Sequence, residues 1–139
     1  MMKTVILETL LKLLIPIFIV FALYMFVRGH DNPGGGFIAG LIVVIPVMIH
    51  SIAYSSEETI KKYHIKPILM TVCGLFLAAL SGTVGMIDGA PFMTSIWSEY
   101  TIPLLGKVGT PILFDLGVML IVSGMVLKVT FLFSEKYKL

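Results

Sequence analysis

The sequence has few of the residues that redox, metal and nucleic-acid chemistry require. Cysteine occurs once, at Cys73, so one copy of the chain cannot form an intrachain disulfide, a Cys-x-x-Cys redox pair or a thiolate zinc site. Glutamine is absent, Asn32 is the single asparagine, and only 13% of the residues are charged. The ten basic and eight acidic residues give a net charge of +2 without a polybasic run, which excludes a nucleic-acid-binding surface.

Apolar residues dominate what is present. They make up 58% of the chain, and the mean hydropathy is +1.02, which is too apolar for a soluble domain. A bilayer core of about 30 Å needs roughly 20 apolar residues in a helix. Four runs of this kind cover about 5–27, 36–55, 67–87 and 108–133. We therefore predict an all-α integral membrane protein, with residues 1–139 forming a single domain of four transmembrane helices.

The basic residues predict the orientation of these helices. Eight of the ten lie at or beside one end of the predicted bundle, namely Lys3, Lys12, Lys61, Lys62, Lys66, Lys128, Lys136 and Lys138. Only Arg28 and Lys107 fall on the other side. Because cytoplasmic loops are enriched in lysine and arginine, we expect both termini in the cytoplasm, and the turn 28–35 and the long loop 88–107 on the outer side. Trp97 and Tyr100 suit a connector at the membrane interface.

Small residues recur at helical spacing inside three of the predicted spans. The positions are Gly36 and Gly40 in the second span, Gly74, Ala78 and Gly82 in the third, and Gly117 and Gly124 in the fourth. Such stripes let two helices approach closely in lipid, where no hydrophobic force drives them together. They predict helix packing, either among the chain's own helices or against other proteins.

Two ionisable residues lie well inside predicted spans. Asp115 falls about 8 Å inside the outer end of the fourth span, where it could bind a cation, relay a proton or accept hydrogen bonds from a neighbouring backbone. His50 could titrate near neutral pH, but it is the only deep histidine, so paired haem ligation is not available within one chain. A packing role is favoured for both residues, because no second acid lies deep in a span.

The turn between the first two spans reads GHDNPGGGF, from Gly29 to Phe37. Three consecutive glycines permit positive φ angles and close approach of main chain to another surface. Gly34, Gly36 and Ala39 also match a G-x-G-x-x-[GA] fingerprint, but that motif requires a strand before it and a soluble helix after it. The turn therefore predicts a specific packing or subunit contact, and not a dinucleotide site.

Two segments carry a resemblance to a known family. GHDNPGGGFIAGL resembles the signature of the B subunit of Mrp-type multisubunit cation/proton antiporters (the MnhB/MrpB family), and TPILFDLGVMLIVSG resembles the last helix of that subunit. The resemblance covers essentially the whole chain. It implies that the family's turn residues correspond to Gly29, His30, Pro33, Gly34, Gly35, Gly36 and Phe37, and that its last-helix acid corresponds to Asp115.

The resemblance also implies a function. It predicts an accessory, non-catalytic subunit in the bacterial cytoplasmic membrane, with no enzyme activity, cofactor or metal. Its partners would be large complex-I-like subunits and other small membrane subunits, which together exchange Na⁺ or K⁺ for protons in pH and salt homeostasis. Three alternatives stay open: a self-sufficient homodimeric four-helix cation/proton transporter, the equivalent subunit of a membrane-bound hydrogenase, and a membrane oxidoreductase, which is disfavoured because ligating residues are so few.

Overall fold

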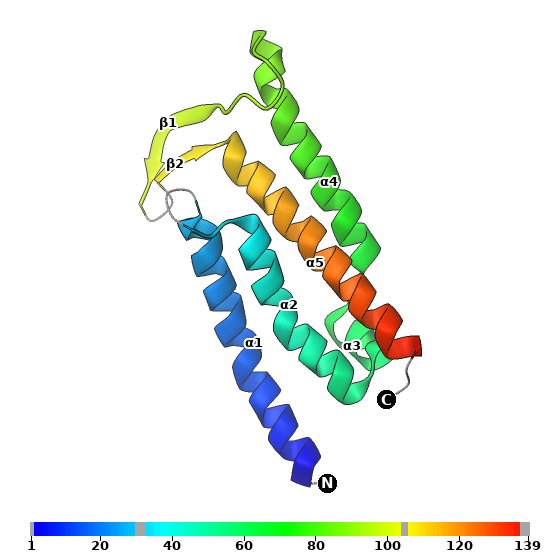
Figure 1. Ribbon diagram of the computed structural model, residues 1–139. Helices are drawn as coiled ribbons and strands as arrows, with labels where there is room; N and C mark the ends of the chain where they lie inside the picture. The colour runs from blue at the N-terminus through cyan, green and yellow to red at the C-terminus, as the bar shows by residue number, and fades with distance from the viewer. Residues whose placement is uncertain (1, 30–32, 104–105, 137–139) are drawn as a thin grey trace.

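The computed structural model describes residues 2–29, 33–103 and 106–136, and it is mostly helical. The elements are α1 (Met2–Arg28), α2 (Gly36–Tyr54), α3 (Ser56–Tyr63), α4 (Pro67–Thr83), the 3-10 helix η1 (Val84–Asp88), β1 (Trp97–Ile102), β2 (Gly106–Gly109) and α5 (Thr110–Lys136). Figure 1 shows both termini and α3 at one end of the bundle, here called the terminal end. The two strands and the glycine turn between α1 and α2 lie at the other end, the hairpin end.

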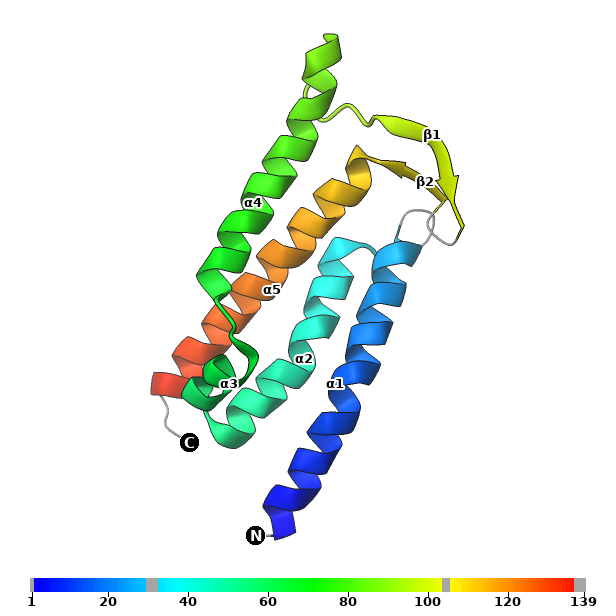
Figure 2. The same ribbon diagram turned by 180° about the vertical axis from the view of Figure 1, so that it is seen from behind.

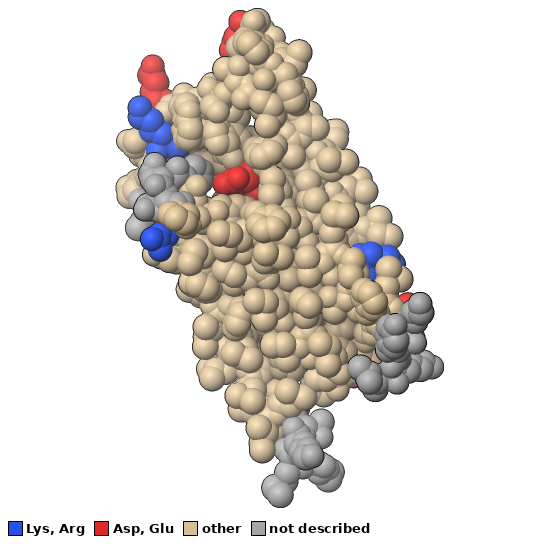
Figure 3. All heavy atoms as spheres, in the orientation of Figure 1, with Lys and Arg blue, Asp and Glu red and all other residues tan. Residues whose placement is uncertain are grey.

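Four of the described helices are long and apolar enough to cross a membrane: Val5–Arg28, Gly36–Tyr54, Pro67–Asp88 and Thr110–Glu135. Many of their large side chains face outward, including Ile17, Leu75 and Phe76, as a lipid-facing surface requires. Figure 3 shows charged atoms mainly towards the ends of the bundle, with a broad uncharged surface between them. The four predicted spans are thus confirmed as helices of transmembrane length.

The four long helices form a row in the order α4, α5, α2 and α1, as the two opposite views show (Figures 1 and 2). Helix α5 packs against both α4 and α2, whereas α1 packs mainly against α2. At the terminal end, Val44, Leu127 and Phe131 form a buried cluster between α2 and α5. Helix α1 is the least covered, and within it only Leu11 and Ala22 are buried among the side chains described.

Backbone-to-backbone contacts join α4 to α5. A Cβ added to Gly74 would lie 2.6 Å from the carbonyl oxygen of Gly117, and a Cβ on Gly117 would lie 2.7 Å from that of Gly74. The Gly117 position also faces Ala78. One heptad further along α5, Gly124 faces Pro67 and Thr71 of α4. Neither helix could carry larger side chains here without separating from the other.

The other small residues face different neighbours. Gly40 of α2 lies against Met119 and Val122 of α5, and a Cβ there would be 2.9 Å from the Met119 carbonyl oxygen. Gly82 faces Phe92 and Met93 of the following loop, and the Met93 amide donates to the Gly82 carbonyl oxygen at 3.0 Å. Gly82 therefore packs against the loop that follows η1 and not against another membrane span.

The all-α expectation was wrong for the loop after α4. Strands β1 and β2 pair antiparallel, with Thr101 opposite Lys107 and Ile102 opposite Gly106. Trp97, Tyr100 and the β-branched residues of β1 favour extended backbone, and Gly106 adopts the φ of +70° that the turn requires. The pairing satisfies main-chain groups that an unstructured loop would leave to water.

The helix bounds also differ from the expected ones at several points. The segment 55–66, expected as a loop, contains α3, whose N-cap Ser55 accepts a hydrogen bond from the Glu58 amide at 3.3 Å. Helix α4 ends at Thr83 and tightens into η1, which reaches Asp88. Helix α5 begins at Thr110 and not at 108, because β2 occupies the residues before it.

The contact between α4 and α5 can be tested with one enlarged glycine. We expect Gly74→Val to lower the free energy of unfolding by about 1–3 kcal/mol, because the added methyl groups collide with α5 backbone. Ala79→Val is the matched control, since Ala79 lies on the exposed face of the same helix. Thermal unfolding in detergent measures both, and equal midpoints for the two variants would contradict the packing.

Candidate functional site

The glycine turn holds the end of α1 tightly against the start of α2. The Gly35 amide donates to the Met25 carbonyl oxygen at 2.9 Å, and the Gly35 carbonyl oxygen accepts from Ala39 at 3.0 Å. A Cβ on Gly34 would lie 2.5 Å from the Met25 carbonyl oxygen, and a Cβ on Gly29 would collide with the Gly35 backbone. Side chains at these positions would push the two helix ends apart.

This turn meets Asp115 of α5, although some 80 residues separate them in the sequence. Gly35 has a φ of +95°, and a Cβ there would lie 3.3 Å from Asp115 Oδ2. A Cβ on Gly36 would collide with the carbonyl oxygen of Asp115 itself. The structure therefore brings together the two segments that carry the family resemblance. Figure 3 shows an acidic patch within the uncharged surface near the start of α5.

The position of Asp115 suits a carboxylate electrostatically. The side chain is half-buried beside the first turn of α2, whose N-cap, Gly35, offers no side-chain cap. The start of a helix carries a partial positive charge, so a nearby carboxylate stabilises it by about 0.3–1 kcal/mol. One turn further along α2, the Gly40 carbonyl oxygen accepts a hydrogen bond from Ser123 of α5 at 3.2 Å, which adds a buried polar link between the same two helices.

Phe37 and Pro33 lie on the outside of this junction. Phe37 is 56% exposed, whereas Gly36 and Ala39 beside it are buried against the bundle. Pro33 is also exposed, and His30, the remaining polar candidate of the turn, lies outside the described residues. The turn thus presents an aromatic ring and a proline ring to whatever surrounds the chain.

His50 belongs to a separate network at the terminal end. Its Nδ1 lies 2.8 Å from Thr59 Oγ1, and the Thr59 hydroxyl donates to the Ser55 carbonyl oxygen at 2.7 Å. Because that proton is already used, the Thr59 oxygen must accept from His50 Nδ1–H. Nε2 then accepts from the Lys62 ammonium group at 3.3 Å. The buried His50 is therefore the neutral Nδ1–H tautomer, and it fastens α3 to α2.

Aromatic and hydroxyl groups complete the surroundings of this histidine. The ring centroids of Tyr54 and Tyr63 lie 4.7 and 5.1 Å from that of His50. The Tyr54 hydroxyl is buried and has no hydrogen-bond partner within the described part of the chain. Tyr54 is also one of the residues that line a cavity of about 830 Å³ between the ends of α2 and α5, together with Glu57 and Glu135.

Asp115 and His50 do not form one site. Asp115 contacts the start of α2, whereas His50 lies 14 residues further along that helix, a rise of about 21 Å. Over residues 2–29, 33–103 and 106–136, no three His, Cys, Asp or Glu side chains lie close enough to hold a metal ion. The geometry therefore supports two structural junctions, one at each end of α2.

Comparison with known proteins identifies the family. Residues 6–128 match the model of a domain related to the MnhB subunit of the Na⁺/H⁺ antiporter. The chain belongs to the MnhB family. It is 36% identical over 126 residues to the Na⁺/H⁺ antiporter's B subunit from Bacillus subtilis (strain 168), covering 89% of this chain and 88% of the relative. It is 33% identical over 127 residues to the putative antiporter subunit mnhB2 of Staphylococcus aureus (strain Newman), covering 90% of both chains.

The fold of this MnhB-family chain also resembles part of a solved complex. A chain in the structure of the Mrp complex from Dietzia sp. DQ12-45-1b matches 93% of it with a TM-score of 0.80 and 27% sequence identity. The match covers 14% of that much longer chain. The resemblance inferred from the two sequence segments is thus confirmed at the level of the family.

Sequence reasoning missed several contacts of the two junctions in this MnhB-family chain. From the sequence, neither Thr59 nor Ser123 was singled out, and Lys62 was considered only for its charge. In the structure, Thr59 and Lys62 bond to His50. Ser123 bonds to Gly40. A signal for α3 was available, because Ser55 and Glu58 have the spacing of a helix-capping box. No periodicity marks Ser123, whose role depends on the approach of α2.

Replacing Gly35 tests the junction with Asp115. We expect Gly35→Ala to lower the free energy of unfolding by more than about 1–3 kcal/mol. The backbone angles of Gly35 (φ +95°, ψ −176°) are almost restricted to glycine, and the new methyl group also crowds the carboxylate. Gly89→Ala is the control for a positive φ in open space, since Gly89 has a φ of +77° and a ψ of 9° with nothing within 4 Å of the added Cβ.

A double-mutant cycle then isolates the contact. Asp115→Ala should lessen the cost of Gly35→Ala and leave the cost of Gly89→Ala unchanged, with a coupling of about 0.5 kcal/mol or more. Thermal unfolding of the purified variants in detergent provides the values. Additive effects at Gly35 and Asp115 would contradict the junction.

Proposed function

We propose that this chain is an accessory, non-catalytic subunit of a multisubunit Na⁺(K⁺)/H⁺ antiporter, required for assembly and coupling of the exchange. Such a complex would serve pH and salt homeostasis in the bacterial cytoplasmic membrane. The names of its relatives support the antiporter. The observation that carries the accessory role is the close approach of Gly35 and Gly36 to Asp115, which places the acidic residue at a packing contact between α2 and α5.

The distribution of ionisable groups supports the same proposal. A path for ions through this chain would need polar groups in succession across the membrane. Among the described residues of the spans, Glu8 and Lys12 pair with each other at 2.9 Å near the start of α1, and His50 is engaged by Thr59. Lys128 lies in the half of α5 nearer the terminal end. Asp115 stands at the hairpin end, remote from these four residues. The chain therefore depends on other subunits for translocation.

Phe37 is the side chain best placed to contact another subunit. It projects from the first turn of α2, directly beside the buried Gly36 that rests on Asp115. Aromatic side chains are frequent hot spots of interfaces, where truncation costs about 2 kcal/mol or more. A partner packed on Phe37 and Pro33 would thereby be linked to the position of α5.

This role can be tested by antiport in membrane vesicles. We expect Phe37→Ala in the assembled complex to lower Na⁺/H⁺ exchange by about tenfold or more, in step with the amount of complex recovered. Ile52→Ala is the control, because Ile52 is an apolar residue of the same helix with 66% exposure, far from the turn. Normal exchange together with normal complex yield for Phe37→Ala would contradict the proposal. Exchange by the purified chain alone in liposomes would instead support a self-sufficient transporter.

The charge asymmetry supports an orientation with the terminal end in the cytoplasm. Helix α3 and the start of α4 carry Lys61, Lys62 and Lys66, whereas the described basic residues of the hairpin end are Arg28 and Lys107. We further propose that the β1–β2 hairpin lies on the outer side of the membrane.

Cysteine labelling tests this orientation. In a Cys73→Ser background, an impermeant thiol reagent should label Glu99→Cys in intact cells, because β1 faces outward. Glu57→Cys, on α3, should react only in inside-out vesicles; both positions are exposed in the chain. Labelling of both variants after permeabilisation is the control, and the reverse pattern in intact cells would overturn the orientation.

A further inference from the structure

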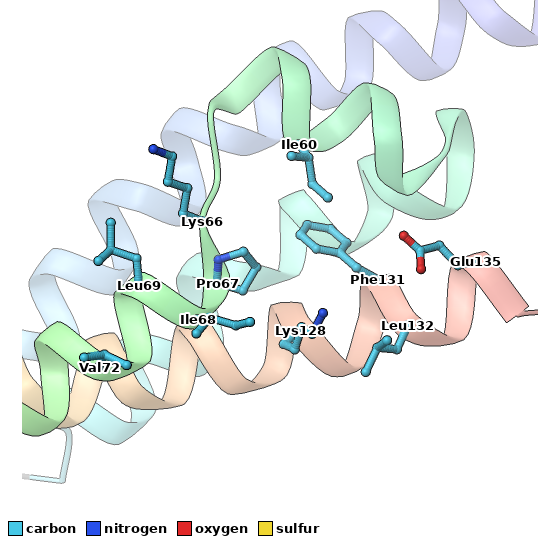
Figure 4. A pocket seen from close by; sticks show the side chains of 10 residues that line it. All are labelled: Ile60, Lys66, Pro67, Ile68, Leu69, Val72, Lys128, Phe131, Leu132 and Glu135. Carbon is cyan, nitrogen blue, oxygen red and sulfur yellow. The ribbon is translucent and has the colours of Figure 1, made fainter.

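The terminal end contains an apolar groove between α4 and α5 that the antiporter proposal does not use (Figure 4). Its volume is about 460 Å³, which lies within the roughly 300–1,000 Å³ of small-molecule sites. The lining comes from α3, α4 and α5 and consists of Ile60, Lys66, Pro67, Ile68, Leu69, Val72, Lys128, Phe131, Leu132 and Glu135. Ile60 and Phe131 point toward one another across it (Figure 4).

The apolar part of the groove runs along the outside of α4. Ile68, Leu69 and Val72 are 62%, 54% and 57% exposed, and Leu132 of α5 is 50% exposed on the opposite side. These side chains lie on helices of transmembrane length, and no described element of the chain covers them. They form the apolar wall of the groove along the first two turns of α4.

Two lysines lie at the rim of this groove. Lys66 is the N-cap of α4 and extends outward at the rim, while Lys128 of α5 lies beside Pro67 and Ile68 (Figure 4). Both side chains are exposed, and neither ammonium group makes a hydrogen bond or ion pair with another described residue. Lys128 thus places an unpaired positive charge within a helix of membrane-spanning length and hydropathy.

The acidic residue of the lining does not cancel this charge. Glu135 lies seven residues beyond Lys128, a rise of about 10 Å further toward the end of α5. The three charged lining residues therefore sum to +1, with both positive charges at the level where α4 begins. That level is where a bilayer places its phosphates, because the apolar part of α4 starts at Pro67.

We propose that this groove binds an anionic phospholipid, with its phosphate between Lys66 and Lys128 and one acyl chain along Ile68, Leu69 and Val72. Basic residues between helices at a membrane surface attract anionic headgroups, and the long lysine stems can reach the headgroup level from inside a helix. The lipid contacts both α4 and α5 at the terminal end, and it neutralises Lys128. The proposal concerns this chain's own surface and does not depend on the antiporter function.

Site-specific photocrosslinking tests the occupant in the assembled complex. A photoreactive residue at Leu132 is activated in native membranes, and the mass of the adduct identifies its partner. We expect phospholipid adducts in which phosphatidylglycerol or cardiolipin is enriched at least threefold over its share of the membrane lipids. Adducts with another subunit, or lipid adducts in the bulk proportions, would overturn the proposal.

Charge variants then test the headgroup contact. Lys66→Gln combined with Lys128→Gln should return the adducts to the bulk lipid proportions without loss of complex, because neither side chain has a partner within the described chain. Lys61→Gln combined with Lys107→Gln is the matched control: it removes the same charge from exposed lysines outside the groove, and it should keep the enrichment. Undiminished enrichment in the Lys66 and Lys128 variant would refute the assignment. If the double variant failed to assemble, each single variant should show a partial loss.

Discussion

The structure depends on the close approach of α5 to its two neighbours, with almost no side chain between the backbones. Gly117 faces Gly74 on α4, Gly36 faces the Asp115 carbonyl, and Gly40 faces Met119. Van der Waals contact must supply the attraction between helices in lipid, since burial of apolar surface gains nothing there. Because α5 is the middle helix for both α4 and α2, each of these contacts positions the next element in the row.

The close packing of the helices also determines the partners of the buried polar side chains. A hydroxyl or imidazole between helices in a membrane requires a partner within the protein. Ser123 finds one in the Gly40 carbonyl, which is accessible because no side chain lies at that point. His50 finds its partners in Thr59 and Lys62, which α3 folds back over the end of α2. The two ends of α2 are thus fixed by different contacts: close backbone packing beside Asp115 at one end and a histidine hydrogen-bond network at the other.

Most of the helical architecture could be predicted, and the reason is physical. Runs of about 20 apolar residues can satisfy their backbone in lipid mainly as helices, so composition and length determined the four spans. The β1–β2 hairpin and α3 escaped prediction because they lie outside the apolar runs, where short segments carry weaker signals. Trp97 and Tyr100 were interpreted as interface anchors, and the strand that they occupy depends on its pairing with β2.

The sequence by itself determined that the chain is membrane-embedded, that it has four spans and that it belongs to its family, because hydropathy and the turn motif are local properties. Small-residue spacing identified which faces would pack, but it left the partner of each face open. Only the tertiary structure decided that Gly74 faces Gly117, that Gly82 seats a loop and that Gly35 rests on Asp115. Those pairings depend on the order and tilt of the helices, which arise from the packing of all four together.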